Sequence, residues 1–262
     1  MKIIVFGADS SIGKKISNYF DKDDFETCRT SRNQREIENS RVFCDLNHLS
    51  NLDFVKQGDF AIICFGVSSI RVCQDNPEMA WNLNYTKTIQ LMKRLNEKGV
   101  RVIYLSSSSV FEGQDRICGV EQARSPKSNY AKIKCAVEDK IFKSKFTQNY
   151  SVLRLTKVLS PDSQIFLDWE KEFLRNGNIR AFNNRFVYPV NPLKVYSVIK
   201  QLIVSQKAGL FQIRGDKKIS FFEICKQHFE KKGIDSDLIL PELDTDQFRN
   251  VCQTPNLIST PL

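Results

Sequence analysis

The sequence is poor in histidine and has no closely spaced cysteine pairs. Only two of its 262 residues are histidines, His48 and His228, and neither lies in a cluster with metal-ligand spacing. Its eight cysteines are scattered, and no two have CxxC spacing. Several lie inside apolar runs, so we expect reduced, mostly buried thiols in a cytosolic protein. The pattern predicts neither a metal site nor a disulfide framework.

Long apolar runs are also absent. The first apolar stretch, MKIIVFG, is too short for a secretory leader or a membrane span. We therefore expect a cytoplasmic protein that has no membrane partner. No internal repeat or low-complexity tract is visible, and this argues against solenoid and disordered classes.

The charge balance is basic but not patterned. Lysine and arginine number 39 against 30 acidic residues, a net charge of +9. The two signs are interleaved, as where Lys171 lies between Glu170 and Glu172, and no stripe of aromatic and basic residues is present. Nucleic acid is therefore not an expected partner. A solvated basic surface also suits an anionic small-molecule substrate.

Short runs rich in Val and Ile alternate with helical patterns over the first 160 residues. Strands are expected at 2–7, 25–30, 59–66, 100–107 and 151–156, and helices near 12–20, 77–98 and 128–145. Runs such as AIIC have no polar alternation, as expected of parallel strands buried on both faces and joined by helical crossovers. The sequence predicts an α/β fold with a doubly wound parallel sheet of the Rossmann type.

The alternation breaks down after residue 160, where turn residues such as Asn183-Asn184 accumulate. A helix at 193–205, a strand at 209–215 and a helix at 221–231 with Ser220 as its N-cap follow. The length favours one main core with a smaller appended lobe. We expect a dinucleotide-binding domain over 1–160, to which 187–207 returns, and a small C-terminal substrate lobe made of 161–186 and 208–262.

The first strand leads into a glycine turn, Gly7-Ala8-Asp9-Ser10-Ser11-Ile12-Gly13, which opens a helix. Such turns let the backbone approach a pyrophosphate held at a helix N-terminus. Ser10 replaces the middle glycine of the GxxGxxG pattern, which makes the turn tighter for a ligand. A purely structural glycine turn is the alternative.

Positively charged residues follow the second strand, where a dinucleotide fold contacts the adenosine ribose. Arg29, Ser31 and Arg32 stand there without an acidic residue, and this favours the 2′-phosphate of NADP(H) over NAD(H). Surface charges on a loop are the alternative. Asp45, at the end of the run VFCDL, either accepts from the adenine amino group or caps the following turn; both interpretations stay open.

The pentapeptide Tyr130-Ala-Lys-Ile-Lys134 places a phenol and an ammonium on one helix face. The positive charge should lower the tyrosine pKa toward the working range and make the phenol a general acid or base. The preceding strand ends at Ser107, whose hydroxyl is expected at the same sheet edge, where it can donate to a reacting oxygen.

The order of these motifs resembles extended short-chain dehydrogenases/reductases. GADSSIG (7–13), CDL (44–46), CQDNPEMAWNLN (73–84), VIYLSSSSVFEG (102–113), YAKIK and SVLRLTKVLSP (151–161) carry the resemblance. Within this superfamily, the chain is most similar to the dTDP-4-dehydrorhamnose reductase family. Members of that family reduce nucleotide-linked 4-ketosugars in bacterial surface-polysaccharide synthesis. The likeness is specific over residues 1–160 and thin beyond them.

The resemblance implies roles for individual residues. Ser107 binds the substrate carbonyl, Tyr130 donates the proton, and Lys134 holds the nicotinamide ribose. The cofactor-binding residues that it implies, together with those inferred above, are Gly7, Ser10, Ser11, Ile12, Gly13, Arg29, Ser31, Arg32, Asp45, Leu46, Phe65, Gly66, Asn84, Tyr130 and Lys134. A homodimer is compatible with the resemblance, although no self-complementary apolar helix face identifies an interface.

The chain departs from the family where an Arg-Pro pair is usual near the C-terminus, because Thr254-Pro255-Asn256 stands there. Two other functions remain. The first is an NAD-dependent epimerase or dehydratase, which Arg32 disfavours. A dehydratase is further disfavoured because Ser108 and Ser109 stand where an Asp-Glu pair is usual. A non-catalytic, dinucleotide-binding regulatory subunit is disfavoured by retention of all three catalytic positions.

Overall fold

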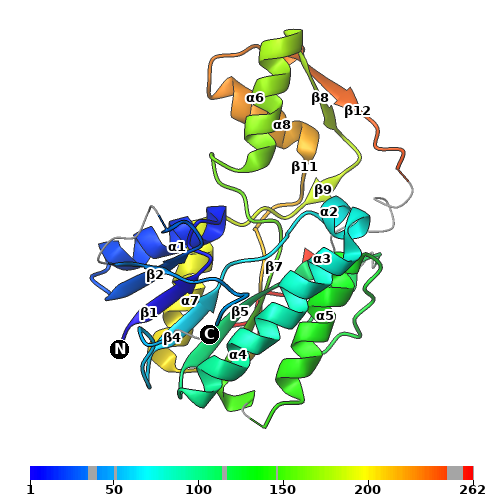
Figure 1. Ribbon diagram of the computed structural model, residues 1–262. Helices are drawn as coiled ribbons and strands as arrows, with labels where there is room; N and C mark the ends of the chain where they lie inside the picture. Colours follow the sequence, from blue (N-terminus) through cyan, green and yellow to red (C-terminus); the bar gives the residue numbers. More distant parts are fainter. Residues whose placement is uncertain (35–39, 50–51, 114–116, 146, 247–255, 262) are drawn as a thin grey trace.

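The computed structural model (Figure 1) describes residues 1–34, 40–49, 52–113, 117–145, 147–246 and 256–261. Within them, the largest element is a seven-stranded parallel sheet. Its strands lie in the order β10 (Gly209–Ile213), β7 (Tyr150–Leu155), β5 (Arg101–Ser107), β4 (Phe60–Ile63), β1 (Ile3–Phe6), β2 (Thr27–Ser31) and β3 (Arg41–Phe43). The predicted doubly wound fold is confirmed.

The central strands are buried on both faces, which explains their continuous apolar sequence. In β1, Ile3 and Val5 pack into one hydrophobic layer, whereas Ile4 and Phe6 pack into the other. Side chains that alternate along a strand reach opposite faces, so both faces need apolar residues. The sheet is therefore the centre of two cores.

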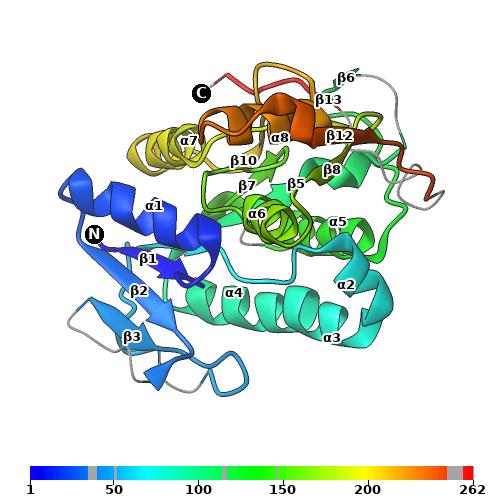
Figure 2. The ribbon, with the colours of Figure 1, turned by 90° about the horizontal axis from the view of Figure 1, so that it is seen from above.

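Helices cover both faces of the sheet (Figure 2). On one face lie α1 (Ser11–Lys22) and α7 (Pro192–Ser205), which contact each other through the edge-to-face rings of Phe20 and Tyr196. On the other lie α4 (Thr88–Glu97) and α5 (Asn129–Phe142). Because α7 packs on α1, the chain lies against the main domain again over α7.

The helix expected at 77–98 is a composite. It runs through α3 (Pro77–Trp81), the π-helical segment η2 (Asn82–Lys87) and α4, and the separate α2 (Ile70–Asp75) precedes it. π-helical turns within helices are often found at functional sites, and η2 contains the buried Asn84.

The small lobe stands beyond the carboxyl ends of the sheet strands (Figure 1). It has its own hydrophobic core, which includes Trp169, Ile179 and Phe229. Its elements are α6 (Gln164–Asn176), β8 (Ile179–Phe182), β9 (Phe186–Val187), β11 (Ile219–Ser220), α8 (Phe221–Glu230), the 3-10 turn η5 (Ser236–Leu238) and β12 (Ile239–Glu242). Ser220 caps α8 in a capping box with Glu223, as the sequence predicts for its N-cap.

The domain boundary expected at residue 208 is wrong. Strand β10 pairs with β7 as the edge of the main sheet, and β13 (Asn256–Leu257) pairs with β6 (Ile117–Cys118) beside that edge. The apolar run of β10 satisfies its backbone and buries Phe211 and Ile213 by adding to an existing sheet. The lobe's described elements end at β12.

Three features considered in the sequence can be compared with the structure. The seven cysteines in the described part of the chain are all buried. None of the helices described is both long and apolar enough to cross a membrane. Across the same residues, His, Cys, Asp and Glu side chains do not gather into a group of three or more that would hold a metal ion.

Candidate functional site

Strand β5 and helix α5 bring the three expected catalytic side chains to one place. Ser107 is the last residue of β5 and caps the short 3-10 turn η3 (Ser108–Phe111), with its hydroxyl accepting from the Ser109 N–H at 3.1 Å. Ser128 caps α5, its hydroxyl accepting from the Ala131 N–H, so Tyr130 lies in the first helical turn. Lys134 follows one turn later on the same face.

The Lys134 ammonium is held by the sheet. It donates to the Leu105 carbonyl at 2.8 Å and lies 4.6 Å from the centre of the Tyr104 ring and 5.7 Å from that of Tyr130. Burial lowers the pKa of Lys134 to about 8, which Glu138, one turn further along α5, opposes. The amine therefore titrates near physiological pH.

One expectation about Tyr130 is wrong for the protein without ligand. Burial raises the pKa of the phenol to about 12, although its hydrogen bond with Ser107 acts in the opposite direction. The Lys134 ammonium is bonded to the Leu105 carbonyl rather than to the phenol. At neutral pH the phenol is protonated, the form that donates a proton.

The glycine turn is built as a tight cradle. Gly7 has φ +82°, and a Cβ there would lie 2.6 Å from the Phe65 nitrogen. A Cβ on Gly13 would meet the Gly7 carbonyl at 2.4 Å. The Ser10 hydroxyl donates to the Gly7 carbonyl and accepts from the Gly13 N–H. The hydroxyl thus stabilises the turn from within.

The start of α1 leaves two backbone N–H groups without an acceptor among the described residues. In the described residues, no acceptor bonds the N–H of Ser11 or Ile12. Helix N-termini leave such donors for anions. The turn therefore fits a dinucleotide pyrophosphate, which Ser11, Ile12 and Gly13 would border.

The loop after β4 lies against the turn and against Tyr130. Asn84 fixes it, because its Oδ1 accepts from the Val67 N–H and its Nδ2 donates to the Val67 carbonyl, both at 2.8 Å. A Cβ on Gly66 would lie 2.8 Å from the Asn84 Oδ1. Val67 and Tyr130 pack on one small apolar cluster. Asn84 therefore orients the Phe65–Gly66 loop between the glycine turn and Tyr130.

The three residues expected to contact the ribose have different surroundings in the structure. Arg29 is bonded to Asp21 and to Ser40, and Asp21 lies ten residues after Ser11, about 15 Å along α1. Arg29 is thus directed away from the turn, and its expected ribose contact is wrong, because its position in mid-strand points it at the far end of α1. Arg32 is exposed beyond β2, and Ser31 is bonded to Asp9 at 2.8 Å.

The two residues expected near adenine have other contacts. Asp45 accepts from the Asn47 N–H at 2.9 Å and pairs with His48 at 3.2 Å, so it caps a turn, the second of the two interpretations above. Leu46 is buried in the core on the α4 face. Thr254 and Pro255, in the segment that replaces the family's Arg-Pro pair, lie outside the described residues.

Sequence reasoning missed four residues at this edge. Glu112 anchors the start of α5, and Asp9 and Arg41 pair beside the glycine turn. Asp9 and Glu112 lie inside motifs of the sequence, but no sequence pattern indicates these contacts. Lys157 follows β7, and surrounding protein lowers the pKa of its exposed side chain. A lone cation after a strand was the only available signal for it.

Comparisons agree with this architecture. The profile of the RmlD substrate binding domain family matches residues 1–257. Over 258 residues, 93% of this chain and 76% of the relative, the chain is 20% identical to methionine adenosyltransferase 2 subunit beta of Bos taurus.

Two solved structures share the fold. The dTDP-4-dehydrorhamnose reductase of Bacillus anthracis, in complex with NADP, has a TM-score of 0.81 at 15% identity over 99% of this chain and 90% of that chain. The dTDP-glucose 4,6-dehydratase of Streptomyces venezuelae, with NAD and TYD bound, has a TM-score of 0.81 at 16% identity over 99% and 88%. The predicted resemblance to extended short-chain dehydrogenases/reductases is confirmed.

Proposed function

Since the chain belongs to the RmlD substrate binding domain family, we propose that it is an NAD(P)H-dependent reductase of a nucleotide-linked 4-keto-deoxysugar. One observation carries the proposal: Ser107, Tyr130 and Lys134 meet at the carboxyl end of β5, two strands from the glycine turn after β1. Ligands of open α/β sheets bind along this edge. The physiological setting we propose is bacterial surface-polysaccharide synthesis in the cytoplasm.

The residues divide the work of reduction. A reduced nicotinamide, when bound, supplies hydride to the ketone carbon. Tyr130 gives its proton to the carbonyl oxygen, which its pKa of about 12 keeps available. Ser107 turns its hydroxyl from Ser109 to the same oxygen and shares the developing negative charge. Lys134 holds the nicotinamide ribose and supplies a cation behind the phenol.

The lobe is proposed to bind the nucleotide part of the substrate. It stands over the sheet edge that carries the catalytic groups, and an exposed, partly desolvated Lys157 lies where the chain leaves β7. Its ammonium is the group we assign to a substrate phosphate. Of the three residues from which a preference for NADP(H) was expected, Arg29 and Ser31 are bonded to acidic side chains and Arg32 is exposed beyond β2.

The experiment is to mix purified protein with NADH or NADPH and a panel of nucleotide-linked 4-ketosugars and to follow loss of nicotinamide absorbance. Consumption with one sugar supports the proposal and identifies the substrate. Absence of consumption across the panel, with tight dinucleotide binding, would refute it.

Two relatives favour alternatives that the same experiment separates. A neighbour in fold is a dehydratase solved with NAD; protein that converts a sugar nucleotide without consuming added NADH or NADPH would have this kind of activity. A sequence relative is named as a subunit of another enzyme; dinucleotide binding with no conversion of any sugar would indicate a regulatory subunit. A homodimer stays a prediction.

A further inference from the structure

The sequence has no acidic residue directly after β2, but the structure brings one there from another element. Asp9, in the glycine turn, accepts from the Ser31 hydroxyl at 2.8 Å. Ser31 is the last residue of β2. A carboxylate therefore lies at the end of the second strand, the position from which dinucleotide folds contact the adenosine ribose.

The Asp9 carboxylate is held there by a set of neighbouring bonds. The Gly7 N–H donates to the Thr30 hydroxyl at 3.2 Å, and the Ala8 N–H donates to the Thr30 carbonyl at 3.3 Å. These bonds lay the turn along the end of β2. The Asp9 side chain remains 46% exposed, so its carboxylate can still reach a ligand.

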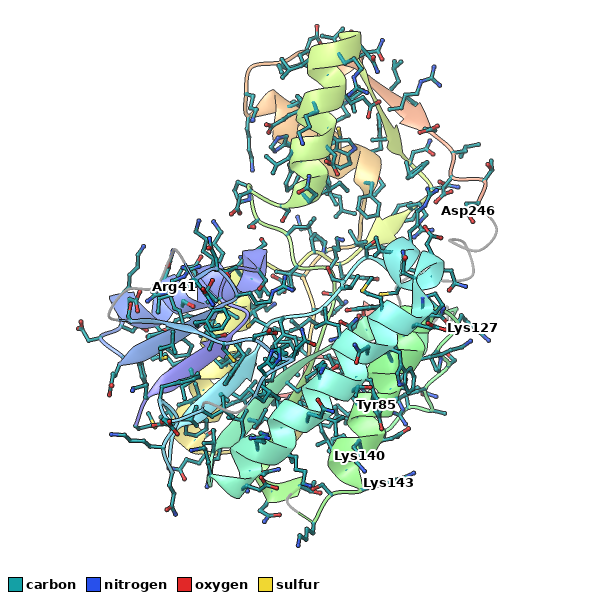
Figure 3. The ribbon with its side chains drawn as sticks, viewed as in Figure 1. Arg41, Tyr85, Lys127, Lys140, Lys143 and Asp246 are labelled. Carbon is teal, nitrogen blue, oxygen red and sulfur yellow. The ribbon has the colours of Figure 1, made fainter. Side chains whose placement is uncertain are left out.

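The cation that pairs with the Asp9 carboxylate is Arg41. It pairs with Asp9 from the first residue of β3, and Figure 3 shows it on the α1 side of the molecule, far from Lys127. Arg29, its register partner in β2, is paired with Asp21 instead. The charge of Arg41 is thus balanced by Asp9 before any ligand binds.

We propose that Asp9 sets the dinucleotide preference of this chain, by accepting a hydrogen bond from the ribose 2′-hydroxyl of NAD(H) and repelling the 2′-phosphate of NADP(H). The inference rests on the dinucleotide site of the proposed function. A carboxylate beside the ribose suits a hydroxyl donor, whereas a dianionic phosphate needs uncompensated cations. Ser31 orients the carboxylate, and Arg41 limits but does not reverse its charge.

The test measures binding rather than turnover. Affinities of NADH and NADPH are determined by titration calorimetry for the unaltered protein and for Asp9→Asn. Removing the negative charge while keeping the shape is expected to shift the affinity ratio toward NADPH by about tenfold to a hundredfold. The matched control is Asp21→Asn, which removes the carboxylate paired with Arg29 at the other end of α1; its ratio should stay within about twofold of the original.

A second variant is expected to change the ratio of NADH and NADPH affinities in the opposite direction. Arg41→Gln leaves the Asp9 carboxylate without this cation and should shift the ratio further toward NADH. Circular dichroism confirms that each variant is folded. An unchanged ratio in both Asp9→Asn and Arg41→Gln, or an equal shift in Asp21→Asn, would overturn the inference.

The outcome is separable from that of the proposed function. If the ratio shifts as expected but no 4-ketosugar is reduced, Asp9 keeps its role and only the reductase proposal fails. If neither dinucleotide binds the unaltered protein, both fail.

Discussion

Glu112 and Ser128 are bonded twice, and through this contact a buried carboxylate holds the start of α5. The Glu112 Oε1 accepts from the Ser128 hydroxyl and its Oε2 from the Ser128 N–H, both at 2.7 Å; the Lys127 N–H also donates to Oε2, at 2.9 Å. Glu112 is fully buried. Because Tyr130 lies two residues after Ser128, this carboxylate positions the phenol through the start of α5.

Glu112→Gln should therefore misplace the first turn of α5. An amide replaces one of two accepting oxygens, at a cost of about 1–3 kcal/mol in the free energy of unfolding. We expect a lower kcat with dinucleotide affinity nearly unchanged. Urea denaturation measures the free energy of unfolding, and steady-state kinetics measures kcat. Glu97→Gln, on an exposed face of α4, is the control; equal effects in the two variants would contradict this role.

Tyr130→Phe removes the proton donor and leaves the ring in place. We expect turnover to fall by about a hundredfold or more, while NADH and NADPH affinities change little. Rapid kinetics measures turnover, and calorimetry measures the affinities of NADH and NADPH. Retained turnover would count against Tyr130 as the acid.

Reduction should lose rate as pH rises through about 8. Below the Lys134 pKa of about 8 the ammonium is charged, and above it the charge is lost; Tyr130, with a pKa of about 12, stays protonated throughout. The descending limb of kcat/KM against pH should therefore report Lys134. Lys132→Ala, an exposed lysine on the same helix, should leave the limb in place. A limb that begins only near the tyrosine pKa would argue against this assignment.

Asn84→Ala should loosen the loop between cofactor turn and catalytic groups. Both hydrogen bonds to Val67 are lost from a buried site, at about 1–3 kcal/mol of stability. Dinucleotide affinity should fall with it, because Phe65 borders the glycine turn. Thermal unfolding and calorimetric titration provide the measurements, and Asn82→Ala in the same helical segment is the matched control. Similar losses of affinity in both variants would speak against a specific role for Asn84.

Arg154 forms a buried ion pair that links β7 to α5. Its guanidinium donates to both Glu138 oxygens, at 3.0 and 2.7 Å, and both side chains are almost fully buried. Arg154→Met leaves the Glu138 carboxylate buried with fewer partners and should cost about 3–5 kcal/mol of stability. Arg71→Met removes an exposed pair with Asp75 and should cost less than about 1 kcal/mol. The denaturant midpoints of the two variants measure these losses of stability.

The order of strands and helices, the glycine turn and the Tyr130–Lys134 helix were predictable from sequence, because each depends on local periodicity, capping and spacing. Ser220 caps α8 as predicted, and the structure shows that Ser10 and Ser128 cap α1 and α5. The seventh strand was assigned to the wrong domain, since pairing of β10 with β7 joins residues more than fifty positions apart and no local signal encodes such a partner.

The sequence by itself determined which chemical groups follow each buried strand, because hydrophobic runs and turn residues mark where strands end. Only the tertiary structure decided what those groups contact. It turned Arg29 toward Asp21, brought the Asp9 carboxylate to the end of β2 and raised rather than lowered the Tyr130 pKa. Hydrogen bonding, ion pairing and desolvation depend on distances between residues remote in the chain, and these exist only once the sheet has formed.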